Sequence, residues 1–184
     1  MGWFILLIFI IFVIIIVTKF SKKPKKDEKE TWIIRDKQPQ KAGDAYKAWI
    51  TGEIPKMLKA LDKPAHPVDR HFLLMGIVEQ TYKLRNSDPK KRDLCERIAW
   101  QHVEKFPQIK KPLMEDLEME VPPRVPTFQH LSTLLTEKGE YDKAVEICNK
   151  AMELGLNDGT KGGFEERIKR IRNKQKREQK GTET

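Results

Sequence analysis

The sequence predicts an all-α protein in which an N-terminal transmembrane helix precedes a body of helix–turn–helix units. Residues 3–17 contain no polar side chain, which suggests a membrane span. The remainder shows apolar residues at helical spacing and almost none of the alternation typical of strands. Two of the expected helices are separated by a short turn at Gly139, which indicates a helical hairpin.

We expect five segments along the 184 residues of the chain. Changes in charge, proline content and hydrophobic periodicity mark their boundaries. The segments are a transmembrane helix over 1–18, a basic flexible linker over 19–40, a helical region over 41–124, a helix–turn–helix repeat over 125–158, and a capping amphipathic helix with a basic tail over 159–184.

The apolar run is interpreted as an uncleaved anchor. A helix of about 18 residues is roughly 27 Å long, close to the ~30 Å hydrocarbon core of a bilayer. A removable signal peptide is the alternative, but no basic residue precedes the run and no small-residue cleavage site follows it. Lysines follow closely from Lys19, so the expected protein is single-pass in a bacterial cell membrane, with its N-terminus outside and its C-terminal domain cytoplasmic.

The net charge of +9 is unevenly distributed. Residues 38–160 are neutral overall, whereas residues 19–37 carry +4 and residues 161–184 carry +5. Nucleic-acid binding by the body is therefore not expected. The basic flanks suit contact with anionic lipid. The expected partners are the lipid bilayer, through residues 1–18, and an unidentified protein.

The helical region should contain several helices broken by glycine and proline. Pro107 is expected to end the last long one, because a proline inside a helix removes a backbone hydrogen bond, and Pro112 to begin a short piece. The pair over 68–107 is either a diverged copy of the downstream repeat or an unrelated hairpin. The expected helices span 44–50, 54–61, 68–85 and 89–106.

The segment over 125–158 shows the most specific pattern. Small residues at Ser132, Ala144 and Ala151 would let two helices approach closely while larger side chains fill the space beside them. In these positions the segment resembles a tetratricopeptide repeat, a helix–turn–helix unit of about 34 residues that stacks into an α-solenoid. An ordinary helical hairpin is the alternative. The resemblance assigns repeat packing to Phe128, Leu131, Ser132, Leu135, Gly139, Tyr141, Ala144, Cys148 and Ala151.

No enzyme, cofactor or metal site is expected. The chain lacks HExxH and GxSxG motifs, and its two cysteines are not in a CxxC pair. The run Gly159–Gly163 contains a lysine but lacks the order of a P-loop, so we interpret it as a connector. The acidic run over 115–120 lacks EF-hand spacing and is interpreted as a solvated helix face.

The resemblance implies a peptide-binding surface on the first helix of the repeat. We therefore predict a membrane-anchored cytoplasmic scaffold or adaptor that binds another protein. The alternative function is peripheral binding of nucleic acid or anionic lipid through the basic C-terminal helix. The predicted peptide-binding residues, for which ordinary solvated surface is the alternative, are Gln129, His130, Thr133, Thr136 and Glu137.

Overall fold

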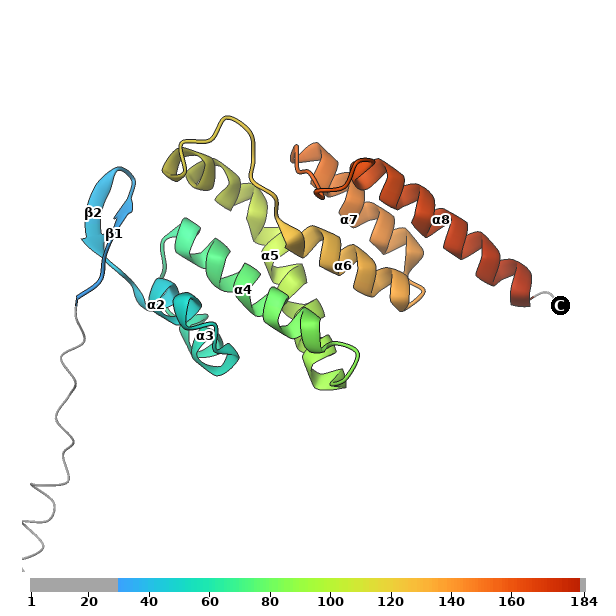
Figure 1. Ribbon diagram of the computed structural model, residues 1–184, viewed down its shortest axis with the longest axis horizontal. Helices are drawn as coiled ribbons and strands as arrows, with labels where there is room; N and C mark the ends of the chain where they lie inside the picture. Colours follow the sequence, from blue (N-terminus) through green and yellow to red (C-terminus); the bar gives the residue numbers. More distant parts are fainter. Residues whose placement is uncertain (1–29, 183–184) are drawn as a thin grey trace, which may run out of the picture. The chain divides into compact units, whose positions relative to one another are not determined.

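The computed structural model describes residues 30–182, and residues 32–182 belong to one compact unit (Figure 1). This part of the chain is mostly helical but also contains a two-stranded antiparallel hairpin. The strands are β1 (Trp32–Arg35) and β2 (Gln38–Lys41), and the helices are α2 (Asp44–Thr51), α3 (Ile54–Ala60), α4 (Pro67–Leu84), α5 (Pro89–Asp116), α6 (Pro126–Glu137), α7 (Tyr141–Glu153) and α8 (Gly163–Thr182).

The helices pack as successive antiparallel neighbours, which Figure 1 shows from α2 through to α8. Helix α4 contacts α2, α3, α5 and α6, while α7 lies against α6 and α8. One continuous apolar core extends from Ala45 in α2 to Ile171 in α8. Each helix buries one face in this core. Stacking of this kind stabilises helical pairs that are too small to fold alone.

The prediction of a membrane-spanning fold is corrected by the structure. Within residues 30–182, no helix is both long enough and apolar enough to cross a bilayer. The longest helix, α5, carries many charged side chains along its length. The predicted span over residues 1–18 lies outside the described residues. The single-pass membrane localisation, with its outside N-terminus and cytoplasmic body, has no support in residues 30–182 and is not retained.

The β1–β2 hairpin lies in a segment that we expected to be linker. Asp36 and Lys37 both have positive φ, 51° and 61°, and form the two-residue turn that joins the strands. Arg35 attaches the hairpin to the helices, because its guanidinium lies 2.7 Å from Asp69 Oδ1 and 3.1 Å from Asp116 Oδ2. Both carboxylates are almost fully buried. These long-range ion pairs therefore stabilise a hairpin that the local sequence predicts only weakly.

Helix α5 continues through both of its prolines, so the prediction that Pro107 ends it is wrong. Phe106, Ile109 and Leu113 follow one another along its buried face. Pro107 itself is exposed, so its ring lies on the solvent side of the helix and not in the core. Core packing of the second half of α5 outweighs the local cost of the prolines.

Helices α6 and α7 form the hairpin expected near residues 127–154. Gly139 occupies the turn with φ +79°, a conformation that favours glycine. Ser132, Ala144 and Ala151 are buried where the two helices pack together. The other side chains that we assigned to packing are also buried: Phe128, Leu131, Leu135, Tyr141 and Cys148.

A chain of buried polar groups connects α4, α5 and α6. His71 Nδ1 lies 2.9 Å from His102 Nε2, and His102 Nδ1 lies 2.8 Å from Thr127 Oγ1. Burial lowers the pKa of His71 to about 4, and burial together with the neighbouring His71 lowers the pKa of His102. Both rings are therefore neutral near pH 7, and their hydrogen bonds align the start of α6 with the preceding pair of helices.

Candidate ligand-binding groove

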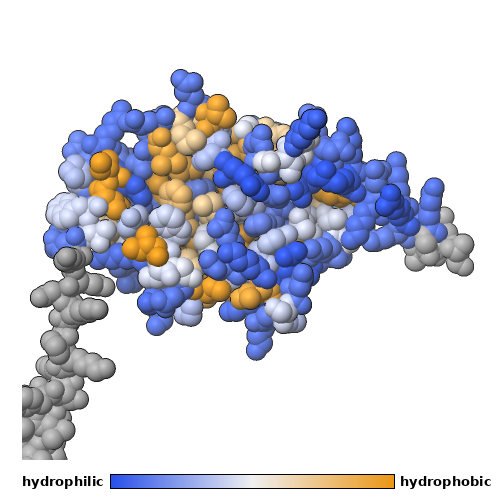
Figure 2. Space-filling view, viewed as in Figure 1, coloured by the Kyte–Doolittle hydropathy of each residue, from blue (hydrophilic) through white to orange (hydrophobic). Residues whose placement is uncertain are grey.

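A groove of about 210 Å³ separates the exposed faces of α6 and α8. Its α6 wall carries two hydroxyls and a carboxylate, and its α8 wall carries three cations beside the apolar Ile171. Hydrophilic side chains cover the α8 region, on the right in Figure 2. The lining residues are Thr133, Thr136, Glu137, Arg167, Arg170, Ile171 and Lys174.

An ion pair next to the groove positions α8. Asp158, in the loop before α8, has a fully buried side chain and lies 3.2 Å from Arg167 Nη2. Burial opposes ionisation of Asp158, but hydrogen bonds from Thr160 and the charge of Arg167 outweigh it and lower the pKa of this carboxyl. Arg167 Nη1 also donates to Thr133 Oγ1 at 3.3 Å, so it connects the loop, α8 and α6.

The two threonines of the groove are held by their own helix. Thr133 donates its hydroxyl to the carbonyl of Gln129 at 2.9 Å, and Thr136 donates to the carbonyl of Ser132 at 2.6 Å. A hydroxyl that donates one hydrogen bond still has lone pairs that accept others. Thr136 therefore presents an oriented acceptor to the groove.

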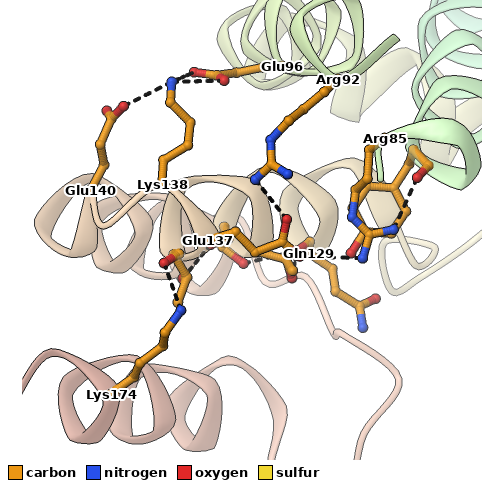
Figure 3. A network of polar contacts seen from close by, with 12 residues as sticks. Arg85, Arg92, Glu96, Gln129, Glu137, Lys138, Glu140 and Lys174 are labelled. Carbon is orange, nitrogen blue, oxygen red and sulfur yellow. Dashed lines mark hydrogen bonds and ion pairs between the residues drawn. The ribbon is translucent and has the colours of Figure 1, made fainter. Parts of the chain in front are cut away.

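Glu137 connects the groove to the neighbouring helices. Its carboxylate oxygens lie 2.8 Å from Arg92 Nη2 and 3.4 Å from Arg85 Nη2. The Arg85 guanidinium also stacks on the Tyr82 ring, with 3.8 Å between Cζ and the ring centroid. Figure 3 shows Arg92 and Lys174 approaching α6 from opposite sides. Glu137 is thus a carboxylate held by two arginines at one end of the groove.

The cations of α8 differ in how far they are already neutralised. Arg167 is paired with Asp158. Within the part of the chain that the structure describes, Lys174 has only long contacts, 3.4 Å to the Thr136 carbonyl and 3.6 Å to Glu178. Arg170 makes no hydrogen bond or ion pair within residues 30–182. Arg170 and Lys174 are therefore the groove cations best able to bind an external anion.

The structure divides the five residues that we predicted to bind peptide. Thr133, Thr136 and Glu137 line the groove. Gln129 instead accepts a hydrogen bond from Arg124 Nη2 at 2.6 Å. His130 stacks on Tyr82 with ring centroids 3.8 Å apart, and burial is the main reason its pKa falls to about 4. Neither Gln129 nor His130 is among the residues that form the groove.

We did not predict the α8 wall of the groove from the sequence. The resemblance that we used assigns binding only to the first helix of the repeat, whereas Arg167, Arg170 and Lys174 lie 30 to 37 positions after its last residue, Glu137. Their spacing of three and four residues places them on one helical face. That periodic basic face, beside the apolar stripe of Phe164 and Ile171, was the available signal.

Neither cysteine and no residue of the acidic run over 115–120 lines the groove. Across residues 30–182, no three His, Cys, Asp or Glu side chains are grouped to hold a metal ion. Cys95 and Cys148 are buried, and burial raises the pKa of both thiols. The acidic residues near 115–120 contribute to a separate open cavity of about 680 Å³ beside Lys37 and Met119.

Comparison of the chain with protein-family models, curated proteins and solved structures finds no match. The tetratricopeptide assignment therefore has no support beyond the resemblance over residues 125–158. What the structure provides is a pair of packed helices followed by α8, with a groove between α6 and α8.

Proposed function

We propose that the helical body of this protein is a protein-interaction module that binds a segment of a partner protein in the groove between α6 and α8. The observation that carries the proposal is the groove itself, in which three predicted contact residues of α6 face three cations of α8. Membrane attachment forms no part of this proposal.

The rigidity of the groove supports a binding role. Arg167 is fixed by Asp158 and Thr133, and Glu137 is held by Arg85 and Arg92. Side chains that are already ordered lose less entropy when a ligand binds. The volume of about 210 Å³ is below the roughly 300–1,000 Å³ typical of pockets for drug-sized ligands, and it suits a few side chains of a larger partner.

Site-specific photocrosslinking in cells tests the proposal. A photoreactive residue in place of Glu137 should form a discrete adduct with another protein, because Glu137 lines the groove and its replacement leaves the three cations of α8 in place. The matched control places the same residue at Asn149, which is exposed on α7 and outside the groove. The absence of an adduct at position 137, or the same adducts at both positions, would count against a groove that binds protein.

Nucleic-acid binding by the end of α8 is the second candidate. Lys176 and Arg177 are exposed there and belong to a helix with an excess of basic residues. Deleting residues 165–184 is a poor test, because it removes Ile171 from the core. Exchanging Lys176 and Arg177 for glutamine is cleaner. Loss of binding to single-stranded RNA in that variant, with the groove substitution Arg170→Gln having no effect, would favour this second candidate.

A further inference from the structure

We infer that the partner segment is acidic and extended, and that Arg170 and Lys174 bind two of its carboxylates. This inference rests on the proposed function, since it names the chemistry of the ligand in the same groove. It assigns Arg170 and Lys174, which lay outside the predicted contact set, as the residues that determine specificity.

The charge of the groove and its surroundings favours an anionic ligand. Five cations and three carboxylates lie in or directly against the groove, which leaves a net charge of +2. Asp158 compensates Arg167, and Glu137 alone faces both Arg85 and Arg92, while Arg170 stays uncompensated within the described chain. The set consists of Arg85, Arg92, Arg167, Arg170 and Lys174 with Glu137, Asp158 and Glu178.

The separation of the two anchor cations fits an extended ligand. Arg170 and Lys174 are four residues apart on one helix, a rise of about 6 Å. Alternate side chains of an extended peptide point the same way about 6.6–6.8 Å apart. One turn of a whole helix, roughly 10–12 Å in diameter and 5.4 Å long, occupies about 400–600 Å³, which exceeds the groove volume of about 210 Å³. Carboxylates at positions i and i+2 of an extended segment therefore match the two cations.

The α6 wall supports a peptide rather than a nucleic acid. Thr136 presents a hydroxyl acceptor that a backbone N–H of the ligand can use. Glu137 lies in the same wall and would repel the continuous phosphates of a nucleic-acid strand. A peptide can place two carboxylates against α8 and keep uncharged backbone beside Glu137.

The test measures fluorescence anisotropy of labelled twelve-residue peptides with the full chain. One peptide carries glutamates at i and i+2, a second carries the same residues at i and i+1, and a third carries glutamines at i and i+2. We expect the first to bind at least tenfold more tightly than the third and several-fold more tightly than the second. The double variant R170E/K174E should weaken binding of the first peptide at least tenfold.

The matched control is K169E/K176E, which changes the charge of α8 equally at exposed positions outside the groove. Circular dichroism verifies folding of both double variants. Equal losses in the two double variants, or equal binding of the glutamate and glutamine peptides, would overturn the inference. A single-stranded oligonucleotide that displaces the peptide and depends on Arg170 and Lys174 would overturn it as well.

The two proposals fail in different ways. An adduct at position 137 in cells, with no preference for glutamate peptides, would leave the protein-binding function and reject the acidic ligand. No adduct at position 137 would reject the protein-binding function itself.

Discussion

Arg167 forms an ion pair with Asp158 at 3.2 Å, and this carboxylate is fully buried between the α7–α8 loop and α8. The same arginine reaches across to Thr133 on α6. The width of the groove therefore depends on one buried contact. Removing the carboxylate would leave Arg167 without its charge partner and loosen α8.

We predict that Asp158→Ala lowers the free energy of unfolding by about 3 kcal/mol, because breaking a buried pair leaves an uncompensated charge. Urea denaturation measures this loss. The control is Asp142→Ala, whose carboxylate is 82% exposed and pairs with Arg172. Its effect should stay below about 0.5 kcal/mol. Similar losses in the two variants would contradict the role given to Asp158.

Glu137 should weaken binding of an acidic ligand by like-charge repulsion. We predict that Glu137→Gln raises the affinity for the peptide with glutamates at i and i+2 about threefold, within the usual range for partly exposed charges. Glu146→Gln, at an exposed position of α7, should change the affinity little. A fall in affinity in the Glu137 variant would contradict repulsion between Glu137 and the acidic ligand.

The histidine chain predicts a specific dependence of stability on pH. Folding lowers the pKa of His71 from 6.5 to about 4, so the unfolded chain binds this proton more readily. The stabilisation is complete above pH 6.5 and declines as the pH falls from 6.5 towards 4, by roughly 3 kcal/mol for His71 alone. Urea denaturation at pH 7.5, 6, 5 and 4 measures this slope.

Exchange of His71 for glutamine should reduce that slope, because the variant loses one proton-binding group whose pKa differs between the two states. An unchanged slope would contradict the assignment of acid sensitivity to His71. The stability of His71→Gln at pH 7.5 serves as its own reference, since the exchange also alters the hydrogen bond to His102.

Close packing of α4 against the first two helices predicts a strong effect at Gly76. A Cβ at this position would lie 2.9 Å from Trp49 Cδ1 and 3.2 Å from Met57 Sδ. We expect Gly76→Ala to cost about 1–3 kcal/mol, because crowding a well-packed core forces side chains to shift. Gly43→Ala is the control, since its Cβ would have no atom within 4 Å. Thermal unfolding that ranks the two variants equally would contradict this packing.

The α6–α7 hairpin could be predicted from local sequence patterns alone. Its apolar spacing, its small residues and its turn at Gly139 all lie within one short stretch of chain. The β1–β2 hairpin was missed because its attachment depends on Arg35 reaching Asp69 and Asp116, which are 34 and 81 positions away. For a related reason, we predicted from Pro107 that α5 ends too early. The helix continues because Ile109 and Leu113 are buried in the tertiary core, which local sequence does not reveal.

The candidate site could be predicted only in part. Thr133, Thr136 and Glu137 are on a helix whose exposed face can be read from its periodicity. The contribution of α8 depends on the direction in which the loop after α7 returns the chain, and the buried Asp158–Arg167 pair fixes that direction. Such a buried pair between a loop and a helix has no distinctive spacing in the sequence.

The most direct test of the account is a nuclear magnetic resonance titration of the ¹⁵N-labelled chain with the peptide that carries glutamates at i and i+2. We predict that the largest amide shifts occur at Thr133, Thr136 and Glu137 on α6 and at Arg170 and Lys174 on α8. They should disappear in the R170E/K174E variant. Shifts confined to the end of α5 or to the last turns of α8, or no shifts at millimolar peptide, would contradict a groove that binds an acidic partner.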